Sequence, residues 1–215
     1  MSWFGLSDGW SWLSVGGQEV LRAAEPPVGE PPYLDYQVVR LWEDLLDLLP
    51  RALAEVPPDI AADLRDEDRW LARVERLEAE LSEDAQETLR FWWMRKLDFS
   101  HLSAPPRVWF WRAGAEVRVV WRPALEERGH WVHASGSLSL PVTSFLEEVR
   151  SFDRTFMAAM QERVEVVRAA GGIPGVAIDL AHLQHEQVDR ATWIDNALSR
   201  PAPPEDWEAA RRRSS

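Results

Sequence analysis

The stretch from Arg107 to Arg122, RVWFWRAGAEVRVVWR, constrains the fold more than any other part of the chain. Aromatic and β-branched residues lie on both sides of a short break at residues 113–115. Such residues favour strands, and a break that contains glycine favours a turn, so we predict a β-hairpin. Side chains alternate along a strand, which places Trp109 and Trp111 on one face and Phe110 on the other. The hairpin therefore needs apolar partners around it.

A second β-rich region is predicted at the N-terminus. Residues 3–22 are expected to form a meander of short strands, in which Gly16 and Gly17 supply the positive φ angles of a two-residue hairpin turn. Four prolines in residues 23–32 predict a loop. Two shorter strands are expected at residues 130–134 and 137–140.

Apolar residues recur at helical spacing in the rest of the chain and predict about five helices. The expected ranges are 33–49, about 60 or 66 to 81, 83–97, 144–170 and 179–198. The predicted fold class is α+β, an antiparallel sheet built from the N-terminal meander and the central hairpin region, with the helices packed mainly on one face. Residues 1–200 are expected to form a single domain, and residues 201–215 a disordered polar tail.

Five motifs spread along the chain carry a resemblance to a known family. They are WFGLSDGW at 3–10, VVRLWEDLL at 38–46, WFW at 109–111, FLEEVRSF at 145–152 and IDLAHLQHEQVDR at 178–190. With these motifs the chain resembles a family of uncharacterised proteins, a domain of unknown function, that is common in actinobacteria. The resemblance spans nearly the whole chain and implies no activity and no catalytic residues.

Composition limits the possible environment and partners. The sequence contains no Cys and has a formal net charge of −12. Absence of Cys fits a reducing cytoplasm, and the N-terminal residues lack the pattern of a signal peptide. Apolar runs are too short for a membrane span, so no membrane association is expected. Nucleic-acid binding needs a basic footprint, so no nucleic acid is expected as a partner.

Histidines and carboxylates are the candidates for a metal or catalytic site. His182, His185 and Glu186 lie close together in HLQHE, but the spacing differs from the H-E-x-x-H of helical zinc proteases. His130 and His133 are three apart on a predicted strand and would point to opposite faces. Patterns for a serine hydrolase or for nucleotide phosphates are also missing. We therefore expect no metal, no cofactor and no catalytic residues.

Acidic side chains concentrate in residues 59–87, which hold eleven acidic and four basic residues for a local net charge of −7. One interpretation is a solvated helix face with ordinary ion pairs. The other is a docking face for another protein with a basic surface, steered by charge. The residues expected to make that contact are Asp66, Glu67, Asp68, Glu75 and Glu78.

Two rows of tryptophan offer a second possible site. Trp10 and Trp12 repeat the spacing of Trp109 and Trp111, so each pair shares one face of a strand. Large apolar side chains are usually buried, which favours a core position. A row that faces outward would instead form an aromatic patch able to anchor a protein or a small ligand.

The sequence as a whole predicts a non-enzymatic domain that binds protein. Its most concrete form is a cytoplasmic inhibitor or immunity-type protein that neutralises a basic partner. One alternative is a hydrolase-like enzyme with carboxylates and histidines in a pocket. Another is a small-ligand sensor that uses the tryptophan rows.

Overall fold

The computed structural model describes residues 2–26, 28–80, 82–97, 99, 106–122, 131–132, 135–205 and 207–212. Its strands are β1 (Asp8–Ser11), β2 (Ser14–Val15), β3 (Gln18–Glu19), β4 (Leu34–Gln37), β5 (Arg107–Ala113), β6 (Glu116–Arg122) and β7 (Gly136–Pro141). Its α-helices are α1 (Val38–Leu53), α2 (Pro58–Asp63), α3 (Glu67–Glu80), α4 (Glu83–Trp93), α5 (Val142–Ala169), α6 (Leu180–Arg190), α7 (Trp193–Ser199) and α8 (Trp207–Arg212). A short 3-10 helix, η1 (Trp3–Leu6), comes first. The predicted α+β class is confirmed.

The central hairpin is formed by β5 and β6, as the sequence predicts. The two strands pair antiparallel from Arg107 opposite Arg122 to Ala113 opposite Glu116, and β7 pairs antiparallel with β6. Gly114 turns the chain with a φ of 59°, a conformation that glycine adopts without steric cost. The result is a three-stranded sheet in the order β5-β6-β7.

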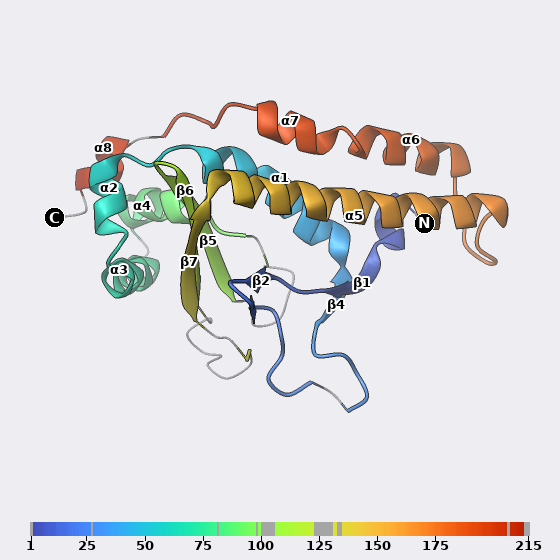
Figure 1. The fold of residues 1–215 in the computed structure, drawn as a ribbon, viewed down its shortest axis with the longest axis horizontal. Helices are drawn as coiled ribbons and strands as arrows, with labels where there is room; N and C mark the ends of the chain where they lie inside the picture. The colour runs from blue at the N-terminus through green and yellow to red at the C-terminus, as the bar shows by residue number, and fades with distance from the viewer. Residues whose placement is uncertain are drawn as a thin grey trace.

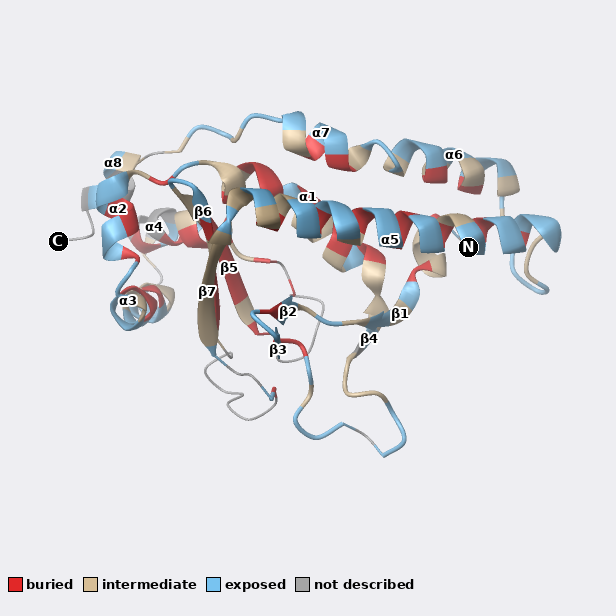
Figure 2. Cartoon of the chain, viewed as in Figure 1, coloured by how far each residue is buried: buried red, intermediate tan, exposed pale blue. Residues whose placement is uncertain are grey.

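Helices cover both faces of this sheet, so the prediction that they pack mainly on one face is wrong. Val108 and Phe110 pack in a core with α1 and α5, whereas Trp109, Trp111 and Val120 pack in a second core with α2, α3 and α4. The two groups of helices lie on opposite sides of the sheet in Figure 1, and buried residues face it from both sides in Figure 2. The reason is that a strand that is apolar on both faces must be covered on both.

The N-terminal region only partly follows the predicted meander. Residues 3–6 are a 3-10 helix rather than a strand, because the buried Trp3 fixes this segment by donating its indole N–H to Gln187 on α6. The hairpin of β2 and β3 is confirmed, with positive φ at Gly16 and Gly17. These strands form sheets of their own and do not extend the central sheet.

Two predicted helices are shorter in the structure because their ends pair with strands. Residues 34–37 form β4 opposite β1, so the helix predicted from Tyr33 begins at Val38. At the other site α4 ends at Trp93, and Leu97 donates its backbone N–H to Val108 on β5 at 2.9 Å. In both places hydrogen bonds to a strand take the place of a further helical turn and satisfy the backbone groups.

The longest helix of the described residues lies in the C-terminal half of the chain. α5 covers 28 residues, and the predicted last helix is divided into α6 and α7. Asp179 caps α6 and Ser82 caps α4 through side-chain oxygens that accept backbone N–H groups. Among the helices of the described residues, none is both long and apolar enough to cross a membrane.

The segment after Pro201 contains structure where the sequence predicts a disordered tail. Glu205 forms an ion pair with the buried Arg95 at 2.7 Å, and Trp207 on α8 lies edge-on to Phe91 with ring centroids 5.5 Å apart. Arg211 on the same helix pairs with Asp59 at 2.6 Å. These contacts tie the segment to α2 and α4, because a buried arginine needs a charged partner.

Candidate functional site

Trp109 and Trp111 lie in the core and are excluded as an aromatic patch. Each is only 2% exposed, and both rings lie nearly perpendicular to the ring of Trp70 on α3, with centroids 5.3 Å and 5.7 Å away. Trp70 is in turn stacked on Trp92 of α4 at 4.5 Å. Edge-to-face and stacked ring pairs contribute stabilisation beyond that of burying their apolar surface. The pair Trp109 and Trp111 therefore stabilises the interface between the sheet and the helices that pack on it.

Trp10 and Trp12 lie on the surface. Their exposed fractions are 56% and 48%, and Trp12 stacks on Tyr33 with a centroid separation of 4.7 Å. Trp10 lies on β1 and Trp12 directly follows that strand. Of the four tryptophans considered for a patch, these two are the accessible ones.

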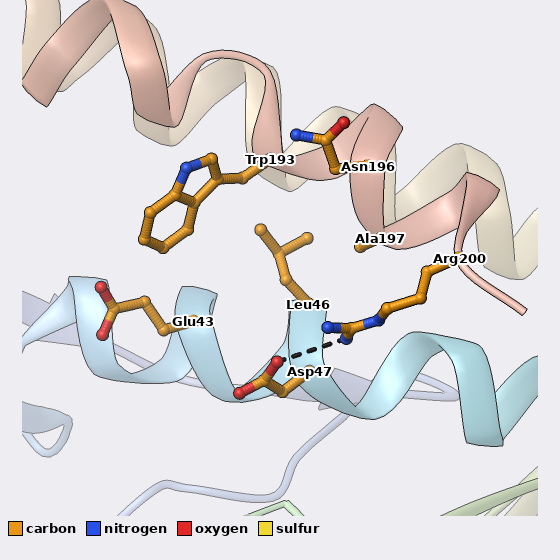
Figure 3. Close-up of a pocket in the computed structure, with 7 residues that line it drawn as sticks. All are labelled: Glu43, Leu46, Asp47, Trp193, Asn196, Ala197 and Arg200. Carbon is orange, nitrogen blue, oxygen red and sulfur yellow. Dashed lines mark hydrogen bonds and ion pairs between the residues drawn. The ribbon is translucent and has the colours of Figure 1, made fainter. Parts of the chain in front are cut away.

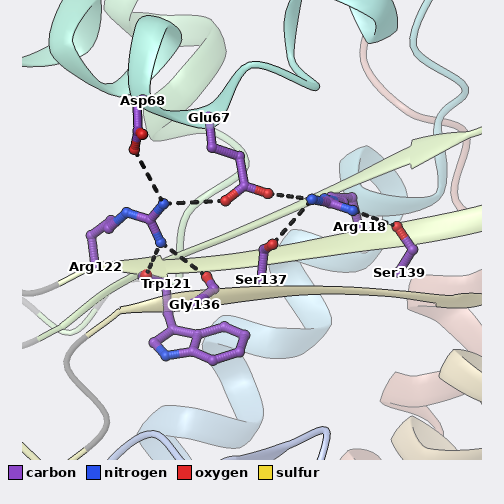
Figure 4. Close-up of polar contacts among 8 residues, drawn as sticks. All are labelled: Glu67, Asp68, Arg118, Trp121, Arg122, Gly136, Ser137 and Ser139. Atoms are coloured by element: carbon purple, nitrogen blue, oxygen red, sulfur yellow. Dashed lines mark hydrogen bonds and ion pairs between the residues drawn. The ribbon is translucent and has the colours of Figure 1, made fainter.

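Glu67 is the centre of a polar network on the face of the sheet below α3 (Figure 4). Its carboxylate pairs with Arg118, and with Arg122 at 3.1 Å, both on β6. Arg118 also donates to the hydroxyls of Ser137 and Ser139 on β7, each at 3.0 Å. Glu67 therefore fastens the start of α3 to two strands of the sheet.

The environment of Glu67 shifts its acidity. Partial burial raises the pKa of the carboxyl, but hydrogen bonds from Ser137 and Arg118 and the charges of Arg118 and Arg122 outweigh burial. The net result is a pKa below the ordinary value of 4.5. The ionised form is thus favoured by the fold, as expected for a structural ion pair.

Two further acidic residues of this region pair with arginines from distant elements. Glu78 on α3 pairs with Arg107 of β5 at 2.7 Å, and both side chains are about one quarter exposed. Asp59 on α2 accepts hydrogen bonds from Arg211, and this contact lowers the pKa of Asp59. Folding therefore neutralises part of the negative charge that the sequence concentrates in residues 59–87.

The remaining acidic side chains of α2 and α3 face solvent. Asp68 is fully exposed and approaches Arg122 only to 3.9 Å. Asp63 and Glu75 are exposed, and within the described part of the chain neither has an ion pair. Asp66 is exposed too, but its carboxylate accepts the backbone N–H of Arg69 and so caps α3. We call Asp63, Asp66, Asp68 and Glu75 the outer acidic face.

One surface cavity lies between α1 and α7 and has a volume of ≈ 500 Å³ (Figure 3). Its charged groups are paired, since Arg200 binds Asp47 at 3.3 Å and Glu43 binds Arg190. Trp193 at its other end stacks on Trp42 with centroids 5.6 Å apart. These pairs hold α7 against α1, which makes a structural role the simplest account of this cavity.

A second cavity, also of ≈ 500 Å³, has an apolar lining. It is bounded by the β2–β3 hairpin, α1, α5 and the sheet face that carries Phe110 and Val119. Trp12 contributes to its wall, and Glu148 on α5 is the charged residue that lines it. We call this space the leucine cavity, because six leucines line it: Leu13, Leu41, Leu45, Leu97, Leu138 and Leu140.

The histidines of α6 do not build a metal site with other described residues. His182 and Glu186 share a face, as the four-residue spacing predicts, and lie 3.7 Å apart, with His182 largely exposed. Glu186 also accepts the backbone N–H of Trp3 at 3.2 Å. In the described ranges, no group of three His, Asp or Glu side chains is arranged to hold a metal. His130 and His133 lie outside the described residues.

Among the described residues, Asp153 and Arg95 are the buried ionisable side chains, and both contact residues of the core. Asp153 on α5 accepts the indole N–H of Trp42 at 2.9 Å, and burial raises its pKa. Arg95 is 1% exposed, and burial lowers its pKa against the opposing effect of Glu205. Neither side chain lines one of the two cavities described above. Asp153 and Arg95 therefore do not provide the acid and base that a hydrolase-like site would need in a pocket.

Comparison with known proteins gives a family without an assigned activity. The model of a family of unknown function, DUF5984, matches residues 1–213. The chain belongs to this family. No curated protein and no solved structure matches the chain. The family resemblance expected from the five motifs is thus confirmed, while the actinobacterial origin stays a prediction.

The leucine cavity and the arginine partners of Glu67 were not predicted from the sequence. Leu41 and Leu45 have helical spacing, but this spacing cannot distinguish a leucine in the core from one in a cavity wall. Arg118 and Arg122 alternate with apolar residues on a strand, which signals that they share a face. Their pairing with Glu67, some fifty residues away, depends on the tertiary fold.

Proposed function

We propose that this chain is a protein-binding domain that docks a basic partner on the outer acidic face of α2 and α3. In its most specific form it is an inhibitor or immunity-type protein that neutralises such a partner. The proposal keeps the expected cytoplasmic location, which rests on a sequence without Cys.

The observation that supports this proposal best is the division of the acidic residues into two sets. Glu67 and Glu78 bind arginines of the sheet and are partly buried, whereas Asp63, Asp68 and Glu75 are exposed. The opposite side of α3 is buried through Trp70, Leu71 and Val74. A helix that is held on its buried side and presents exposed carboxylates suits the steering of a positively charged surface.

The division also decides which residues make a fair test. Charge reversal at Glu67 would put a cation beside Arg118 and Arg122 and destabilise the fold. A loss of binding would then reflect unfolding and not a lost contact with the partner. Asp66 caps α3 and is unsuitable too. The remaining carboxylates of the outer acidic face can be changed with little effect on stability, since they are exposed and their one ion pair among the described residues, between Asp68 and Arg122, is long at 3.9 Å.

The experiment compares two triple variants that carry the same change in net charge. One, which we call the α3 variant because two of its three sites lie on that helix, replaces Asp63 of α2 and Asp68 and Glu75 of α3 by Lys. The matched control replaces three exposed acids of α5, Glu147, Glu162 and Glu165, by Lys. Each tagged protein is used to capture partners from a lysate of its native host, with mass spectrometry as the readout.

The proposal predicts a basic partner whose recovery falls at least about tenfold with the α3 variant, since opposite charges steer the encounter. Recovery with the α5 control should equal that of the parent. An equal loss in both variants would assign the effect to overall charge and contradict a local docking face. Full recovery with the α3 variant would contradict it as well.

A further inference from the structure

We propose that the leucine cavity binds a small amphiphilic cation, a molecule with an apolar body and one protonated amine. This site is separate from the outer acidic face and does not depend on the proposed partner. It uses one of the four tryptophans considered for an aromatic patch, Trp12, together with residues that only the fold brings together.

The size and lining of the cavity indicate an apolar ligand of small-molecule size. Its volume of ≈ 500 Å³ lies within the range of about 300–1,000 Å³ of ligand pockets. Besides six leucines, the wall contains three phenylalanines and three valines. Four separate parts of the fold contribute these side chains, and the elements concerned are labelled in Figure 1.

The leucines are less buried than core residues normally are. All except Leu97 are only partly buried, although they pack against the larger of the two cores. Water in contact with this much apolar surface is unfavourable, and an apolar ligand would displace it. The partial exposure of the leucines therefore distinguishes the cavity from an ordinary packing defect within a core.

Two residues where the cavity meets solvent specify a cationic group. Glu148 is exposed, lines the cavity, and has no ion pair or hydrogen bond within the described residues. Trp12 is half exposed, stacks on Tyr33 and lines the same space. A carboxylate attracts an ammonium group by charge, and the face of an indole attracts it through its quadrupole. An anionic or neutral head group would gain neither contact.

The test uses three probes with the same alkyl chain and different head groups: octylammonium, octanol and octanoate. Isothermal titration calorimetry on the full chain should detect saturable binding of octylammonium, weaker binding of octanol and the weakest binding of octanoate. In parallel, methyl NMR spectra of the unaltered protein should show shifts at Leu41 and Leu138 and none at Leu183, a buried residue of α6 that does not line the cavity.

Matched variants separate the head group from the apolar body. Glu148→Gln should weaken octylammonium binding severalfold and leave octanol binding unchanged, whereas Glu147→Gln on the same helix should change neither. Leu138→Trp should fill the cavity and abolish binding of all three probes. Val166→Trp, at an exposed position of α5 outside the cavity, should have no effect.

Three results would overturn the proposal. One is the absence of saturable binding, together with unshifted Leu41 and Leu138 methyl signals, in the unaltered protein. Another is equal affinity for the ammonium and the carboxylate probe, which would refute the cationic ligand. The third is undiminished binding to a folded Leu138→Trp variant, which would place the probe elsewhere. If Leu138→Trp does not fold, the methyl shifts of the unaltered protein decide the location.

Discussion

Glu67 illustrates how one side chain can have two opposite interpretations. In the sequence it lies in an acidic run and is expected to contact a partner. In the structure its carboxylate forms ion pairs with two arginines of β6, and only 15% of its side chain is exposed. Because its charge is already satisfied, its main role is to hold α3 on the sheet.

Glu67→Gln should therefore lower the free energy of unfolding at neutral pH by about 1–3 kcal/mol, the range for hydrogen bonds to charged groups. The pKa of Glu67 is lower in the folded protein, so its contribution is complete above the ordinary value of 4.5 and is lost as the pH falls through the folded pKa. The difference in free energy of unfolding between parent and variant should therefore shrink as the pH falls.

Urea unfolding at neutral pH and at values below 4.5 measures this difference. Glu75→Gln is the matched control, because Glu75 lies on the same helix, is exposed, and should change stability by no more than about 0.5 kcal/mol. Equal stability of Glu67→Gln and Glu75→Gln at neutral pH would show that the network contributes nothing.

Some residue roles could be predicted from local sequence, and others could not. Gly16 and Gly17 form their turn and Asp179 caps its helix, because each of these roles depends on the residue and its immediate neighbours. Burial of Trp109 follows from the apolar pattern of its strand. Exposure of Trp12 does not follow, because the same alternating pattern is compatible with a core strand and with a surface strand.

At the scale of elements, the C-terminal segment departs most from expectation. Its polar composition predicts a disordered tail, yet Glu205 closes over Arg95, whose guanidinium also lies 4.2 Å from the centroid of Phe91. Composition alone could not reveal this contact, because Arg95 gives no sign in the sequence that it is buried. The same lack of long-range information made residues 34–37 look helical.

Glu205→Ala should lower the free energy of unfolding by about 3–5 kcal/mol, because it leaves a buried guanidinium without its counter-charge. Truncation after Arg200 should cost at least as much, since it also removes Trp207 from Phe91. Glu208→Ala is the control on α8, exposed and without a buried partner. Chemical denaturation provides the values. A truncated chain as stable as the parent would show that residues 201–215 behave as the disordered tail that the sequence predicts.

At the scale of the whole molecule, the fold is a central sheet between two apolar cores. The α+β class and the central hairpin could be predicted, because they depend on hydrophobic periodicity and on turn residues. Helices cover both faces of the sheet because β5 is apolar on both faces. This pattern is present in the sequence, but it does not determine which helix packs on which face. The leucine cavity forms where four parts of the fold meet, so no local sequence pattern predicts it.

The fold of the whole molecule also determines how much of the net charge of −12 is accessible at the surface. Arginines of β5, β6 and α8 neutralise part of the acidic segment, so its full local charge is not available to a partner. What remains is the outer acidic face, a smaller surface on a helix that is fixed from below by Trp70 and Glu67. The proposed function depends on this surface.

The association rate of the captured partner, measured against ionic strength by surface plasmon resonance, tests the docking proposal most directly. Charge steering is screened as the Debye length falls from about 30 Å at low salt to about 8 Å at physiological salt. The parent should associate fast at low salt and slow steeply as salt rises. The Asp63, Asp68 and Glu75→Lys variant should associate about one to two decades more slowly at low salt, with little salt dependence. Identical rates and identical salt dependence for parent and variant would contradict the docking face.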